Sequence, residues 1–293
     1  MFKNTKYKDN AGRVIFENAE LCSQFLKEYS GIEIFKDVQP ENIEDMTERF
    51  LPMFSEERES DVVKKISLPE KGEMFVIALI EHKSTVDYNV VMQMFHYMSY
   101  IWEEYEKSME SEKKGITKTR DFRYPPILPI VYYEDTDTWT SAMNLRERIF
   151  LSDMLTEYIP DYRYILFRLQ EYGNTELIDR KDEISLIMLI NKLRDITDFG
   201  KLSFPEGYFE DFSKKISGDV LIVMSKLIES YLREINLPED DIYGFTDQIK
   251  EGKMARFYEN FHKIDIQEEW RKSREKGREE GREEGDYCRL IRT

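Results

Sequence analysis

Three charged residues in the first third of the chain stand where they could bind a metal and assist a hydrolysis. Glu81 and Lys83 follow an apolar run at residues 74–80, and Asp61 lies at the start of another strand-like run, residues 60–67. Two converging carboxylates can hold a hard divalent cation through oxygen ligands and orient a water against a phosphodiester. A lysine beside them can position that water or neutralise charge in the transition state. These residue types indicate metal-assisted hydrolysis.

Both runs have the composition of β-strands. A short, continuous apolar run that is rich in β-branched residues and bounded by Pro and Gly favours a strand buried on both faces. Because side chains alternate along a strand, Glu81 and Lys83 share one face. Residues 69–73 are short enough to form the turn of a hairpin. Such a hairpin would place Asp61 beside Glu81.

A long helix is expected directly after this strand. Residues 84–87 form a cap-like cluster, and apolar residues then recur at helical spacing from residue 88 to 109. Gln93 and Tyr97 lie four residues apart on a flanking face of this helix, so they are neighbours. Most isolated Gln-x-x-x-Tyr pairs are surface residues, but the position after the Glu81 strand makes a role at the site an equal alternative.

The arrangement resembles the signature of the PD-(D/E)XK nuclease superfamily. Asp61 followed by Glu81-x-Lys83 on an apolar strand is similar to its D…(D/E)xK pattern, although Ser60 stands where the superfamily has Pro. The residues around Asp61 and Glu81, with the helix that carries Tyr97, resemble the recombination-promoting nuclease/putative transposase (Rpn, YhgA-like) group. Many members of that group have Gln where this chain has Lys83. The resemblance covers roughly the first 170 residues well and the remainder loosely.

Gln93 and Tyr97 add to this resemblance, because their spacing on the expected helix is similar to the QxxxY element of RecB-type nucleases. The resemblance implies a DNA endonuclease linked to recombination or mobile-element activity. In such an endonuclease, Mg²⁺ or Mn²⁺ would be bound by Asp61, Glu81 and the backbone carbonyl of His82. The implied catalytic residues are Asp61, Glu81, Lys83, Gln93 and Tyr97. Superfamily members with a further acid on the opening helix make Glu17 and Glu20 weaker candidates for an accessory metal contact.

The order of expected elements predicts an α/β fold. After an opening helix at residues 14–30, the pattern runs β-β-α-β-α-β, which includes a helix at residues 139–155. By resemblance, the sheet is a restriction-endonuclease-like mixed central sheet flanked by helices, followed by a helical C-terminal subdomain. The expected domains are the nuclease domain 1–172, the helical subdomain 173–265 and a charged Gly/Arg/Glu tail 266–293.

Composition limits the partners. A net charge of −16 with 35% charged residues argues mildly against tight nonspecific nucleic-acid binding, since that affinity comes largely from Lys and Arg. DNA is nevertheless the expected partner, because the motif outweighs the overall charge. The expected phosphate contacts are Lys64, Lys65, Lys113, Lys114, Lys118 and Arg120, of which the last four belong to a charged loop expected to be mobile.

The cysteine content and the lengths of the apolar runs indicate a cytoplasmic protein. Cys22 and Cys288 are the only cysteines, far apart in the sequence and without a disulfide framework. No apolar run approaches the roughly 18 residues of a membrane helix. His82 and His96 have no third His or Cys nearby to complete a zinc site, which favours structural roles. The oligomeric state is left open, with a homodimer as one option.

Two other classes of protein remain open. The first is a catalytically degenerate nuclease-fold protein that acts as a binding or interaction module. The second is an unrelated acidic interaction protein, in which Asp61 would lie far from Glu81. The nuclease hypothesis requires Asp61 and Glu81 at one edge of the sheet, with Gln93 and Tyr97 lining the same site.

Overall fold

The computed structural model describes residues 11–50, 61–68, 72–81, 86–193, 198, 202–213 and 216–262. Within these ranges, the side chains of residues 11, 49, 50, 79–81, 213, 261 and 262 are not described. The chain forms two compact units, Gly12–Tyr172 and a second unit that comprises Ala11 and the described residues from Gly173 onward. The tail expected at residues 266–293 lies outside the described residues.

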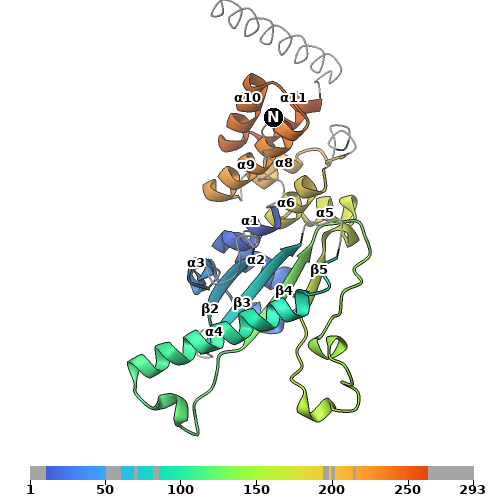
Figure 1. The fold of residues 1–293 in the computed structure, drawn as a ribbon. Helices are drawn as coiled ribbons and strands as arrows, with labels where there is room; N and C mark the ends of the chain where they lie inside the picture. The colour runs from blue at the N-terminus through green and yellow to red at the C-terminus, as the bar shows by residue number, and fades with distance from the viewer. Residues whose placement is uncertain are drawn as a thin grey trace, which may run out of the picture. The chain divides into compact units, whose positions relative to one another are not determined.

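The first unit is built on a mixed five-stranded sheet in the order β1-β2-β3-β4-β5 (Figure 1). The strands are β1 (Ile43–Asp45), β2 (Val62–Leu68), β3 (Gly72–Glu81), β4 (Ile127–Tyr133) and β5 (Ile165–Arg168). The pairs β1/β2 and β2/β3 are antiparallel, whereas β3/β4 and β4/β5 are parallel. The mixed α/β sheet predicted from sequence is confirmed. The short strand β1 is followed by the short helix α3 (Thr47–Phe50).

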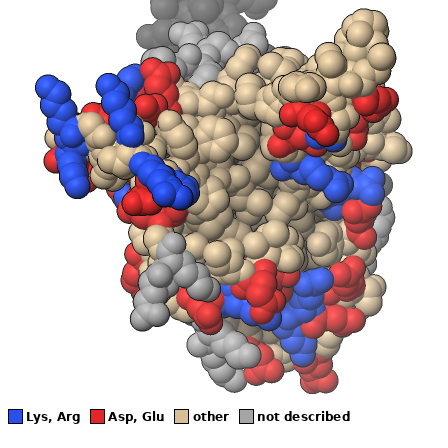
Figure 2. Space-filling model, turned by 90° about the horizontal axis from the view of Figure 1, so that it is seen from below, with Lys and Arg blue, Asp and Glu red and all other residues tan. Residues whose placement is uncertain are grey.

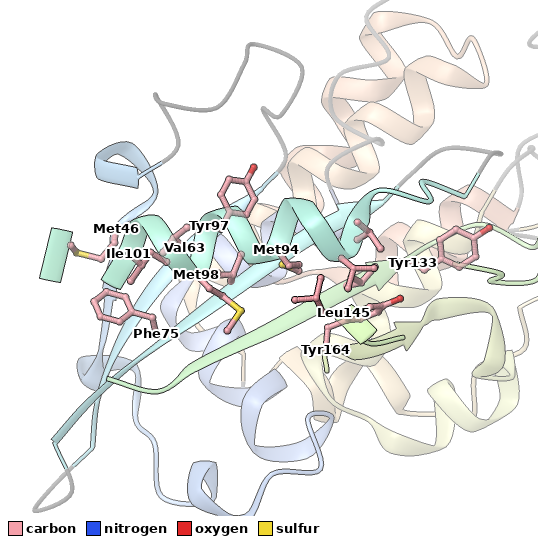
Figure 3. Packing of buried hydrophobic residues seen from close by; sticks show 14 of the residues in the cluster. Met46, Val63, Phe75, Met94, Tyr97, Met98, Ile101, Tyr133, Leu145 and Tyr164 are labelled. Atoms are coloured by element: carbon pink, nitrogen blue, oxygen red, sulfur yellow. The ribbon is translucent and has the colours of Figure 1, made fainter. Parts of the chain in front are cut away.

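One face of the sheet is covered by α4 (Val90–Glu112), the helix that connects β3 to β4. Its apolar side packs on alternate residues of the strands, as the period of two along a strand requires. Figure 3 shows this layer between α4 and the sheet. The buried residues of this cluster include Val63, Phe75, Ile77, Val91, Met94, Tyr97, Met98, Ile101, Val131 and Tyr133.

The opposite face is covered by α1 (Ala11–Glu17) and α2 (Ala19–Glu28). Phe25 of α2 packs against Phe167 of β5 with ring centroids 5.1 Å apart, and Phe16 of α1 contacts Tyr132 of β4 at 6.2 Å. The single helix expected at residues 14–30 is therefore two helices. Asn18 separates them because its Oδ1 accepts a hydrogen bond from Leu21 N and so caps α2.

A buried lysine connects this face to its helices. Lys64 of β2 is 2% exposed, and its Nζ donates to the backbone carbonyl of Glu17, the last residue of α1, at 3.1 Å. The same Nζ lies 3.0 Å from Asp45 Oδ2. A helix C-terminus carries partial negative charge and unsatisfied carbonyls, so an ammonium there is favourable. Burial raises the pKa of the nearby Cys22 thiol to about 12, which leaves the thiol protonated and unreactive.

The Asp45 carboxyl makes the stability of this unit sensitive to acid. Burial alone would raise its pKa, but hydrogen bonds from Thr47 and the Lys64 ammonium outweigh burial and lower the pKa below its ordinary value of 3.8. A lowered folded-state pKa stabilises the fold above the unfolded-state pKa, and this contribution is lost as the pH falls through the folded-state value. We therefore expect Asp45→Asn to lessen the loss of stability between neutral pH and about pH 3.

Urea unfolding of wild type and Asp45→Asn at both pH values measures this effect. The exposed Asp37→Asn variant serves as the matched control and should follow wild type. Parallel losses in wild type and Asp45→Asn would contradict the assignment.

The connection from β4 to β5 differs from the expected helix at residues 139–155. Residues 134–164 contain short 3-10 turns instead, η7 (Leu145–Arg148) and η8 (Thr156–Tyr158). Asn144 caps η7 by accepting from Glu147 N, and Leu151 has a positive φ of 60°. Left-handed backbone at a bulky residue is incompatible with a continuing α-helix, so the helical spacing of apolar residues here was misleading.

The second unit is helical in its described residues, and no strand is assigned there. Its helices are α5 (Asn174–Arg180), α6 (Glu183–Lys192), α8 (Tyr208–Ser213), α9 (Gly218–Glu234), α10 (Glu239–Lys250) and α11 (Met254–His262). The predicted helical C-terminal region is confirmed. In the described part of the chain, no helix combines the length and apolar character needed to span a membrane.

Candidate functional site

Asp61 stands immediately before β2 and is buried, with 4% of its surface exposed. Its Oδ2 accepts hydrogen bonds from Tyr97 OH at 2.6 Å and from Gln93 Nε2 at 3.2 Å. Both donors are themselves buried. Because a buried carboxylate is costly unless hydrogen bonds satisfy it, these two donors explain how the acid is accommodated between the sheet and α4.

The helix geometry explains why both donors reach the same oxygen. Gln93 and Tyr97 are one turn apart on α4, so their side chains leave the helix on the same side. The Tyr97 ring belongs to the apolar cluster, while its hydroxyl contacts Asp61. Of the residues predicted to form the site, the structure brings together Asp61, Gln93 and Tyr97. Their catalytic role stays a prediction.

The end of β3 lies at the same edge of the sheet. Val62 is the Cα partner of Ala78 in the antiparallel ladder, so the Asp61 backbone lies beside the last residues of β3. That strand ends at Glu81, which pairs with Tyr133 of β4. The Glu81 side chain and the whole of His82 and Lys83 lie outside the described residues. The separation of the two carboxylates and the direction of Lys83 therefore stay predictions.

A further buried carboxylate at this edge was missed from the sequence. Glu134 follows the last residue of β4 and is 4% exposed. Its Oε1 accepts from Gly12 N in the first turn of α1, and its carbonyl accepts from Gln170 Nε2. Since Tyr133 faces α4, strand alternation directs Glu134 to the opposite face, away from Asp61. The sequence signal that could have indicated Glu134 is an acid directly after an apolar strand, the same pattern as at Glu81.

Comparison with known proteins identifies the family. A family model described as "Putative transposase, YhgA-like" matches residues 7–215. The chain belongs to the YhgA-like family. The match extends beyond Tyr172 into the helical unit, further than the roughly 170 residues over which the resemblance was clear from motifs. Searches of curated proteins and of solved structures found no match.

The described residues of this YhgA-like protein supply only part of a metal site. Among them, no group of three or more His, Cys, Asp or Glu side chains is placed to hold a metal ion. Asp61 offers oxygen donors of the kind that Mg²⁺ and Mn²⁺ prefer. Glu17 pairs with Arg13 at the surface, and it and Glu20 lie on α1 and α2, which cover the other sheet face. They are not accessory contacts to a metal at Asp61.

The cations proposed as phosphate contacts are not gathered around Asp61. In this YhgA-like protein Lys64 is buried, and Lys65 forms ion pairs with Glu44 and Glu73. Lys113 lies about 24 Å along the α4 axis from Tyr97, at 1.5 Å per residue. The last four proposed contacts, Lys113, Lys114, Lys118 and Arg120, all follow this end of the helix.

The loop that carries these four cations is held by hydrogen bonds to a single carboxylate. Glu110 accepts from the backbone N–H groups of Gly115 at 2.7 Å and Thr117 at 3.0 Å. Gly115 has a φ of 85°, a left-handed conformation that glycine adopts without strain. The segment therefore forms a turn with defined contacts at the far end of α4, and its mobility stays a prediction.

Proposed function

We propose that this protein is a metal-dependent DNA endonuclease of the PD-(D/E)XK type, with a restriction-endonuclease-like sheet. The observation that carries the proposal is the buried Asp61 carboxylate, oriented by Gln93 and Tyr97 at the edge where β3 ends. Carboxylates that ligate metals in proteins are usually hydrogen-bonded themselves, which fixes their orientation. A buried acid with two donors on one oxygen has this property.

The proposed roles follow from chemistry at that edge. Asp61, the Glu81 carboxylate and the His82 carbonyl would hold Mg²⁺ or Mn²⁺. A bound cation of this kind stabilises the negative charge that develops on a phosphodiester during hydrolysis. Lys83 would orient the attacking water, and Gln93 and Tyr97 would hold Asp61 in place. The family name is consistent with DNA as the substrate.

A non-catalytic binding module is the second candidate. It is favoured by the net charge of −16 and by the distance between the proposed cationic contacts and Asp61. In such a protein, the contacts of Asp61 with Gln93 and Tyr97 would only stabilise the packing of α4 on the sheet. DNA binding without cleavage, in the presence of either metal, would support this candidate.

Plasmid cleavage tests the proposal directly. The purified full chain should nick or linearise plasmid with Mg²⁺ or Mn²⁺ and be inactive in EDTA. Lys83→Ala should slow cleavage by about 100-fold or more, because it removes the group that orients water or neutralises charge. Lys226→Ala, a change to an exposed lysine on α9, is the control and should cleave normally.

Cleavage that persists in EDTA, or an unchanged rate in Lys83→Ala, would reject the proposed site. If the proposal holds, rates on single-stranded, duplex and branched DNA would distinguish among roles in recombination, mobile elements and defence.

A further inference from the structure

The connection between β4 and β5 exposes an unusual concentration of large apolar side chains. We call residues 148–158 of this connection the crossover tip. Phe150 is 88% exposed, Tyr158 82% and Met154 77%, and Leu151 and Leu155 are each nearly half exposed. A segment that merely connected two strands would be expected to be polar. A concentration of exposed apolar side chains on this scale usually marks an interaction site.

The backbone of the tip is closed by hydrogen bonds, so its exposed side chains project from a defined backbone. At its base, Leu145 is buried in the core, and Arg146 pairs with Asp161 at 3.6 Å. Within the tip, successive backbone turns are closed by hydrogen bonds such as Ser152 N to Ile149 O and Tyr158 N to Leu155 O. A surface that is ordered before binding loses less conformational entropy when a partner docks.

The size of the apolar surface fits one side of a protein interface. Five large side chains with these exposures present about 700 Å², close to the roughly 800 Å² that each partner contributes to a standard interface. The face of the first unit on the side of this connection is dominated by uncharged residues, with acidic and basic side chains around its border (Figure 2). The surface is therefore large enough for a stable complex.

We propose that the crossover tip is the contact surface for a second copy of this chain, arranged about a two-fold axis. A two-fold contact must be self-complementary. The tip meets this requirement, because it combines apolar side chains with both signs of charge, Arg148 at one end and Glu157 at the other. Neither charge forms an ion pair within the described part of the chain. Each can therefore pair with the opposite residue of the second copy.

The charge of the chain and the position of the tip both favour a second copy of the chain as the partner. A chain with a net charge of −16 repels its own copies over most of its surface, and the tip, with few charges of mixed sign, is a place where two copies can approach. Because β5 begins after the tip and runs parallel to β3, the tip lies at the sheet edge opposite the end of β3 and Asp61. A dimer formed there leaves the Asp61 edge accessible, so the inference does not depend on the proposed nuclease activity.

Sedimentation velocity of the full chain tests the proposal. Wild type should sediment as a dimer of the 35.3 kDa chain, and the triple variant Phe150→Ser, Met154→Ser, Tyr158→Ser as a monomer with an unchanged circular dichroism spectrum. The control Tyr243→Ser removes another exposed aromatic side chain, 55% exposed, from α10 and should remain dimeric. A wild-type monomer at every concentration, or a dimer that persists in the triple variant, overturns the proposal.

A charge-reversal experiment tests whether the partner is a second copy. Arg148→Glu alone and Glu157→Arg alone should each raise the dimer dissociation constant about tenfold or more, because each places like charges across the axis. Mixing the two variants should restore association, since every cross-axis pair is then of opposite sign. A mixture that associates no better than its components overturns the two-fold arrangement. A monomeric wild type whose DNA binding is lost in the triple variant would instead assign the tip to DNA.

Discussion

Asp61→Asn is expected to abolish metal-dependent DNA cleavage while the protein stays folded. The amide keeps the size of the carboxylate and an oxygen that can accept from Tyr97, so the buried packing beside α4 is retained. It removes the negative charge that a divalent cation requires of its ligand. We expect a loss of about 1,000-fold in cleavage rate, which corresponds to roughly 4 kcal/mol of transition-state stabilisation.

The measurement is plasmid cleavage at saturating Mg²⁺ and Mn²⁺, with urea unfolding to verify the fold. Asp121→Asn is the matched control, because it makes the same chemical change at an exposed position in the same unit and should leave the rate unchanged. If Asp61→Asn cleaves as fast as this control, Asp61 is a structural acid and the binding-module candidate is favoured.

Tyr97→Phe separates a positioning role from a structural one. The substitution removes only the hydroxyl that donates to Asp61 at 2.6 Å and leaves the buried ring in place. Loss of a hydrogen bond to a metal-ligating carboxylate typically costs about 10- to 100-fold in metal affinity or activity. The metal concentration needed for half-maximal cleavage should therefore rise. A purely structural hydroxyl would change the unfolding midpoint without changing the metal dependence.

The meeting of Asp61, Gln93 and Tyr97 could be predicted because it depends on local rules. A hairpin places the start of one strand beside the end of the next, and a helix that directly follows the strand returns over the same face. Spacing of four residues then places Gln93 and Tyr97 on one side of that helix. Each step involves neighbours in the sequence, which is why pattern and spacing were sufficient.

Features that depend on distant partners could not be predicted in this way. Glu134 is buried because it meets Gly12, which is 122 residues away in the sequence. The helix expected at residues 139–155 is replaced by turns whose side chains are anchored elsewhere, such as Leu145 in the core beneath α4. In both cases the local pattern was ambiguous, and tertiary packing decided the outcome.

The adjacent lysines of β2 also could not be distinguished from local sequence. They give the second prediction with a large expected effect. From sequence, Lys64 and Lys65 are equivalent cations at a strand. The structure buries Lys64 beneath α1, whereas Lys65 points to the other face and pairs with Glu44 and Glu73 near the surface. Strand alternation makes this division necessary, but only the packing of α1 determines which lysine is buried.

Lys64→Ala should therefore destabilise the first unit far more than Lys65→Ala. The first change empties the space of a buried side chain and leaves the Glu17 carbonyl without its ammonium donor, at a cost of about 4 kcal/mol. The second breaks partly exposed ion pairs and should cost less than about 1 kcal/mol. Urea unfolding followed by tryptophan fluorescence measures both, because Trp102 and Trp139 belong to this unit.

Lys64→Met distinguishes the contribution of packing from that of charge. Methionine fills most of the space of the lysine stem but cannot donate to Glu17 or neutralise Asp45, so we expect an intermediate loss of about 2 kcal/mol. A loss equal to that of Lys64→Ala would show that the ammonium contributes nearly all of the stabilisation. Equal costs for Lys64→Ala and Lys65→Ala would contradict the burial of Lys64 itself, since only a buried side chain leaves a cavity when it is truncated.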